Sequence, residues 1–132
     1  MITYLWVALG GALGSMARFG CSSLVANLFG ATFPLGTLMI NVLGSFVIGF
    51  FATLTGPDGR ILVPGDFRQF VMVGICGGYT TFSSFSLQTM TLVQDGELFR
   101  AGLNVTASVV LCLAAVWLGY IVAASVNAVR GN

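Results

Sequence analysis

Residues 74 to 86 combine two adjacent glycines with a dense set of hydroxyl and aromatic side chains (Gly-Ile-Cys-Gly-Gly-Tyr-Thr-Thr-Phe-Ser-Ser-Phe-Ser). They lie in an uncharged run between Arg68 and Asp95 that is long enough to cross a bilayer. Each glycine costs about 1 kcal/mol relative to alanine inside a helix, so we expect the helix to break at Gly77-Gly78. In hydrocarbon, the unpaired backbone groups of such a break are tolerated only inside protein or beside a polar pathway. The break is therefore the candidate site.

The backbone at such a break could bind ions. A helix that stops at Gly77 presents carbonyl oxygens that carry the negative end of its dipole. Two such ends meeting across a two-fold axis would form an oxygen-lined cation site, as at the broken helices of transporters. We expect a small, hard monovalent cation such as Na+, because no carboxylate lies nearby in the sequence. The restarted half, near Thr80, would present free amides that favour anions.

The side chains around the break are neutral hydrogen-bond donors and aromatic rings. Phe82 and Phe85 are three residues apart, so they share a helical face, and their ring edges carry partial positive charge. Donor groups are supplied by Thr80, Thr81, Ser83, Ser84 and Ser86 and, from another segment, by Asn41. Such groups can replace the water around a small, strongly hydrated anion and still release it, as conduction requires.

Each of these residues also has a purely structural interpretation. The phenylalanines can face lipid, the hydroxyls can bond to their own or a neighbouring helix, and Asn41 can join two helices. Gly77-Gly78 can be a point of close packing. Arg18 near the midplane would cost about 2.5–3.5 kcal/mol on insertion scales, so it either snorkels from a short first span or lines an aqueous vestibule. It is the combination of these features that favours an ion pathway.

The composition predicts a polytopic membrane protein. Of the 132 residues, 57% are hydrophobic and only 7% are charged, whereas soluble domains carry about 25% charged residues. The net charge of +1 argues against nucleic acid as a partner. There is no histidine, and Cys21, Cys76 and Cys112 all lie in apolar segments. We interpret these cysteines as packing residues and not as disulfides or metal ligands.

The charge-free segments predict four transmembrane helices in a single domain over residues 1–132, at about residues 2–28, 34–54, 67–93 and 99–126. Small or polar residues recur every four positions in the first two helices: Gly10, Gly14, Arg18 and Ser22, then Thr37, Asn41, Ser45 and Gly49. The short acidic turn at residues 94–97 makes the last two helices antiparallel. Both termini are expected on one side of the membrane.

The helices and their arginines also predict an oligomer. Four thin helices can hardly enclose a polar path and also cover its outside with apolar surface. The arginines are nearly balanced: Arg60, Arg68 and Arg130 lie on the side of the termini, and Arg100 lies on the other side, with Arg18 as a further candidate there. Such a weak bias under the positive-inside rule would allow insertion in both orientations. The expected assembly is an antiparallel dimer that places two breaks face to face.

Other classes of protein fit the sequence less well. A small multidrug or cation exporter needs a titratable group inside the membrane, but all four acids fall in connections: Asp58, Asp66, Asp95 and Glu97. A non-transporting membrane scaffold explains the glycine-rich faces but not a break loaded with phenylalanine and serine. An enzyme is not expected, because no general base accompanies the serines.

Over essentially all four spans, the chain resembles the Fluc (CrcB-type) fluoride channels. The strongest match is residues 77–86 (GGYTTFSSFS), supported by Gly36-Thr37-Leu38 before Asn41, by Gly44-Ser45-Phe46, and by residues 10–14 followed by Arg18. The resemblance implies an antiparallel, dual-topology homodimer with two fluoride pores. It also implies a central Na+ held by the backbone carbonyls of Gly77 and Thr80 from both subunits.

The resemblance implies roles for individual residues as well. Phe82 and Phe85 correspond to the pore phenylalanines, Asn41 to the pore amide, Ser84 and Ser108 to pore hydroxyls, and Arg18 to the arginine of the first span, at the vestibule. Gln88 departs from the pattern, since relatives often carry an acid there. We expect passive fluoride export from the cytoplasm across the inner membrane of a microbe, which relieves toxicity after hydrogen fluoride leaks in and ionises. The residues alone indicate a small anion, and the resemblance adds its identity.

Overall fold

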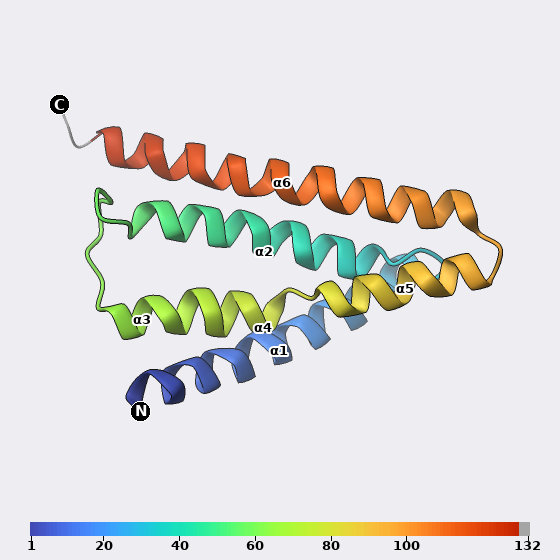
Figure 1. The fold of residues 1–132 in the computed structure, drawn as a ribbon, viewed down its shortest axis with the longest axis horizontal. Coiled ribbons are helices and arrows are strands. Elements are labelled where there is room, and N and C mark those ends of the chain that lie inside the picture. Colours follow the sequence, from blue (N-terminus) through green and yellow to red (C-terminus); the bar gives the residue numbers. More distant parts are fainter. Residues whose placement is uncertain (130–132) are drawn as a thin grey trace.

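The computed structural model describes residues 1–129, which form an all-helical bundle (Figure 1). Three long helices are continuous: α1 (Ile2–Phe29), α2 (Leu35–Leu54) and α6 (Leu98–Ala128). The third segment along the chain is composite, with α3 (Gly65–Gln69), the π-helical η1 (Phe70–Cys76), α4 (Gly77–Tyr79) and α5 (Phe82–Gln94). The expected all-α fold with an interrupted third segment is confirmed. Arg130, which entered the charge balance above, lies outside the described residues.

The helices pack around α2, which lies between α6 and the composite segment (Figure 1). α1 packs against η1 and α4. The start of α1 and the end of α6 lie at the same end of the bundle, and the turn between α5 and α6 lies at the other (Figure 1). The tight connections at that far end use glycine, with Gly30 at φ +81° after α1 and Gly96 at φ +77° after α5.

The position of the break differs from the sequence-based prediction. The chain stays helical through Gly77 (φ −64°, ψ −37°) and leaves the helix only at Thr80 and Thr81. Glycine is needed at Gly78 for close packing, because a Cβ there would meet the Gly11 carbonyl oxygen of α1 at 2.7 Å. A Cβ at Gly14 would likewise meet the Ile75 oxygen at 2.3 Å. The contact with α1 therefore accounts for Gly78, while the threonines carry the interruption.

Most large apolar side chains point outward. The buried core is thin, with Ile40 and Ala123 among the few apolar residues almost fully removed from solvent. Within the described residues, three helical stretches are long and apolar enough to cross a membrane: Leu35–Leu54, Gly65–Gln94 and Leu98–Ala128. α1 has 28 residues, enough to span a bilayer, but it contains Arg18 and is not one of the three. Its role as a fourth crossing, in a single four-span domain, stays a prediction.

Candidate functional site

Two threonines interrupt the third helical segment. Thr80 (φ −86°, ψ 158°) and Thr81 (φ −154°, ψ 118°) are both extended. Thr80 closes the preceding helix, since its amide and its hydroxyl both donate to the Cys76 carbonyl, at 3.0 and 2.9 Å. Thr81 opens α5 as its N-cap, because its Oγ1 accepts from the Ser84 amide at 3.2 Å. The two residues thus satisfy many of the backbone groups that a broken helix exposes.

Asn41 of α2 forms hydrogen bonds with the backbone at the break. Its Nδ2 donates to the Thr81 carbonyl at 3.0 Å, and its Oδ1 accepts from the Thr81 amide at 2.8 Å. In a continuous α-helix the Thr81 amide would donate to the Gly77 carbonyl, four residues back. The side chain of Asn41 therefore takes the place of a helical hydrogen bond. One of its two amide protons remains for another acceptor.

The same contacts leave two carbonyl oxygens without their helical donors. Gly77 loses the Thr81 amide to Asn41, and Thr80 loses the Ser84 amide to the Thr81 hydroxyl. Within residues 1–129, no other backbone hydrogen bond outside the helices reaches either oxygen. Backbone oxygens suit hard cations. Across the same residues, no cluster of three histidine, cysteine or acidic side chains offers an alternative metal site.

A cavity of about 400 Å³ opens on one side of the break. Its lining includes Asn41, Gly77, Thr80, Thr81, Phe82, Phe85, Ser108 and Cys112. Phe85 is buried and Phe82 is exposed, and their ring centroids lie 5.2 Å apart with planes at 51°. The hydroxyl oxygen of Ser108 is buried here and has no hydrogen-bond partner. The cavity thus joins aromatic rings, an amide and an unpaired hydroxyl, which is a set of groups that suits a small anion.

A second cavity, of about 380 Å³, lies on another side of the break and contains the other predicted residues. Arg18 and Ser84 line it together with Ser15, Ser22, Thr37, Thr81 and Gln88. Ser84, which is predicted to be a pore hydroxyl, lines this cavity and not the one that Phe82 and Phe85 line. The Ser84 hydroxyl contacts Thr81 Oγ1 at 3.2 Å. Thr81 lines both cavities and separates them.

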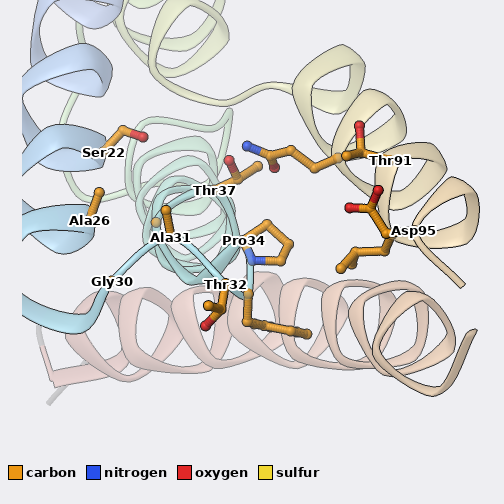
Figure 2. A pocket seen from close by; sticks show the side chains of 13 residues that line it. Ser22, Ala26, Gly30, Ala31, Thr32, Pro34, Thr37, Thr91 and Asp95 are labelled. Atoms are coloured by element: carbon orange, nitrogen blue, oxygen red, sulfur yellow. The ribbon is translucent and has the colours of Figure 1, made fainter. Parts of the chain in front are cut away.

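A third cavity, of about 240 Å³, leads from the second towards the α5–α6 end of the bundle. It shares Ser22, Thr37 and Gln88 with the second cavity. Figure 2 shows its wall, with Ser22 of α1 facing Thr91 of α5 and Asp95, the residue after α5, across Thr37 of α2. The side-chain oxygen of Gln88 is buried without a partner. Hydroxyl and amide groups therefore line both cavities between this end of the bundle and the break.

The structure brings the predicted residues together in two groups. Asn41, Phe82, Phe85 and Ser108 share a cavity with Gly77 and Thr80, whereas Ser84 shares one with Arg18. Sequence reasoning gave Thr81 no special place among the hydroxyls, although it caps α5 and contacts Asn41. The signal was available, because threonine is one of the preferred N-cap residues of helices. It also gave no role to Asn104, which is buried on α6.

Comparison with known proteins extends these findings. Residues 5–120 match the family model described as CrcB-like protein, Camphor Resistance (CrcB). The chain is 61% identical to the fluoride-specific ion channel FluC of Opitutus terrae over 132 residues, which is the whole of both chains. It is 63% identical to FluC of Rhodospirillum rubrum over 126 residues, which is 96% of this chain and 98% of that one. FluC of Methylocella silvestris is 56% identical over 97% of this chain and 98% of its own.

Proposed function

The chain belongs to the CrcB-like family, and on that premise we propose that it is a fluoride-specific ion channel, a multi-pass membrane protein and not an enzyme. The observation that carries this proposal is the cavity beside the break. There the unpaired hydroxyl of Ser108 lies buried among Phe82, Phe85 and Asn41. A buried donor without an acceptor costs free energy, and a dehydrated fluoride ion is an acceptor small enough to occupy such a site.

The groups in the cavity suit fluoride because they donate without carrying charge. Asn41 has one amide proton left after it binds Thr81, and Ser108 has its hydroxyl proton. The ring edges of Phe82 and Phe85 add partial positive charge. Together they can replace part of the ion's water shell, while the absence of a fixed cation among the lining residues lets the ion leave again.

Arg18 is proposed to act earlier on the path, in the second cavity, which holds Ser84 and Thr81. Within residues 1–129, its guanidinium makes no hydrogen bond or ion pair. A positive charge at that position would concentrate anions next to the break. In this proposal the ion first binds at Ser84 and Thr81 in the second cavity, which is the vestibule. It then moves to the cavity that is lined by Asn41, Phe82, Phe85 and Ser108.

The carbonyl oxygens of Gly77 and Thr80 are proposed to hold a structural Na+. Support comes from the loss of their helical donors to Asn41 and Thr81, which leaves two hard oxygen ligands at the break. Two oxygens are too few for a cation, so a second copy of the chain would have to supply more. When bound, Na+ would neutralise the dipoles of the helix ends that meet there.

The functional assembly is proposed to be an antiparallel homodimer with two pores. Phe82 lines the cavity but is 78% exposed in the single chain, so a second copy of the chain has room to pack against this ring. The break, the proposed cation ligands and this exposed ring lie on one cavity, which suits a two-fold axis through it. Dual topology in the inner membrane is part of the same proposal.

The physiological role is proposed to be passive fluoride export. Hydrogen fluoride crosses membranes as a neutral molecule and ionises in the less acidic cytoplasm. A conductive pathway for the anion then lets the membrane potential drive fluoride out, which relieves its toxicity.

Purified protein in liposomes tests the proposal. Vesicles loaded with potassium fluoride and potassium chloride are diluted into a medium without either halide, and valinomycin is added to balance charge. Fluoride and chloride electrodes then follow both ions in the same sample. Fluoride is expected to leave rapidly while chloride stays inside. Equal release of both halides, or release of neither, would refute the assignment.

A further inference from the structure

Asn104, on α6, makes a buried polar contact that none of the pathway residues explains. It is 1% exposed, and its Nδ2 donates to Thr89 Oγ1 of α5 at 2.9 Å. The Thr89 hydroxyl donates in turn to the Phe85 carbonyl at 2.8 Å. The amide of α6 is therefore connected through one hydroxyl to the backbone of a phenylalanine in the proposed fluoride pathway.

Bonds from a hydroxyl to its own helix are common and by themselves carry no function. α5 contains two more of them, from Ser86 to the Phe82 carbonyl and from Thr91 to the Leu87 carbonyl. In the part of the chain that the structure describes, neither of those hydroxyls accepts a hydrogen bond from another helix. Among the described residues, Asn104–Thr89 is the only side-chain hydrogen bond that joins α5 to α6. It is thus the polar contact that fixes one of these helices relative to the other.

The spacing of the residues links this contact to the cavity. Ser108 lies four residues after Asn104 on α6, and Phe85 lies four residues before Thr89 on α5, so each is one helical turn away on the same face. The two helices are antiparallel, and therefore both steps lead in the same direction from the Asn104–Thr89 bond. They end at Phe85 and Ser108, which line the same cavity.

We propose that Asn104 is a positioning residue that sets the register of α5 against α6 and so holds the Phe85 ring opposite the Ser108 hydroxyl. This inference rests on the proposed fluoride pathway and adds a residue that determines how well it binds the ion. Without the bond, α5 loses its polar link to α6 and can shift along or rotate against it. The shift would move the ring edge and the hydroxyl apart without removing either.

The test uses isosteric changes at both ends of the bond. Asn104→Leu and Thr89→Val each remove it, Thr89→Ser keeps the hydroxyl, and the double variant Asn104→Leu/Thr89→Val shows whether both act through one contact. Ser125→Ala is the matched control, since within residues 1–129 its hydroxyl bonds only to the Ile121 carbonyl of its own helix. Each purified protein is reconstituted in liposomes, and fluoride efflux is measured over a range of fluoride concentrations.

Both single variants are expected to raise the half-saturating fluoride concentration about threefold or more, the scale of one interhelical hydrogen bond in a membrane. The double variant should be no worse than either single one, and Thr89→Ser and Ser125→Ala should match the unaltered protein. A change in overall stability alone would lower the amount of folded protein but would not change this concentration.

Several outcomes would overturn the inference. It fails if Thr89→Val and Asn104→Leu conduct with unchanged concentration dependence, or if their effects add in the double variant. If Asn104→Leu does not fold, Thr89→Val is compared with Thr89→Ser. The inference then fails if these two variants have the same half-saturating fluoride concentration. Failure of the unaltered protein to conduct fluoride would refute the proposed function instead, so the two failures are distinguishable.

Discussion

Asn41 makes two hydrogen bonds at the break, one to the amide and one to the carbonyl of Thr81. Because these two bonds need both a donor and an acceptor, substitution of Asn41 by Asp has a specific expected effect. In Asn41→Asp a carboxylate oxygen replaces the donor that faces the Thr81 carbonyl, so that carbonyl loses its partner at a cost of about 1–3 kcal/mol. The new negative charge also repels fluoride in the cavity. We expect a lower thermal unfolding temperature in detergent together with loss of fluoride efflux.

Asn127 provides a matched control for that experiment. Asn127 also bonds to backbone with both of its side-chain polar atoms, accepting from the Arg60 amide and donating to the Thr53 carbonyl, but it lies near the end of α6, away from the break. Asn127→Asp should lower stability and leave fluoride efflux per folded protein unchanged. Rapid fluoride efflux through Asn41→Asp would remove Asn41 from the pathway.

The two phenylalanines are proposed to act through their ring edges, which isoleucine lacks. Phe82→Ile and Phe85→Ile keep an apolar side chain but remove a contribution on the order of 1 kcal/mol, which corresponds to roughly fivefold slower efflux. Liposome efflux should show this loss while the elution volume of the purified protein stays unchanged. Phe99→Ile, at an exposed position at the start of α6, serves as the control. Undiminished efflux in both pathway variants would contradict the ring-edge role.

At the level of helices, α2 must approach the break closely. A Cβ at Gly44 would lie 2.2 Å from the methyl carbon of Thr80. Gly44→Ala should therefore displace Thr80 and cost about 1–3 kcal/mol through overpacking, visible in thermal unfolding and in reduced fluoride efflux. Gly102→Ala is the comparison, because no atom lies within 4 Å of its added Cβ. If both variants unfold at the same temperature, the close contact between α2 and the break is not rigid.

The sequence was sufficient to predict the all-helical fold and the interrupted third segment, because uncharged runs and helix-breaking residues are local signals. It was not sufficient to place the break. The glycines at residues 77 and 78 suggested a helix end, but Gly78 is required by α1, and such a requirement depends on which helix lies next to it. The separation of Ser84 from the phenylalanines has a similar origin. It depends on the rotation of α5 once Thr81 caps it.

For the whole molecule, the proposed dimer and the proposed Na+ should depend on each other. Replacing Na+ with N-methyl-D-glucamine throughout purification should leave the carbonyls of Gly77 and Thr80 without a cation at the proposed dimer interface. We expect a shift from dimer to monomer in size-exclusion chromatography with light scattering, and slower fluoride efflux. Readdition of Na+ should restore both. A dimer indifferent to Na+ would argue against a structural cation at the break.

Ion selectivity is the property on which the proposed pathway depends most, and a reversal potential measures it directly. The protein is placed in a planar bilayer with a fluoride gradient in one direction and an equal chloride gradient in the other. For a tenfold gradient, a fluoride-specific pathway predicts a reversal potential at the fluoride equilibrium value, about 59 mV in magnitude. A reversal potential near zero, or one of the opposite sign at the chloride equilibrium value, would contradict it.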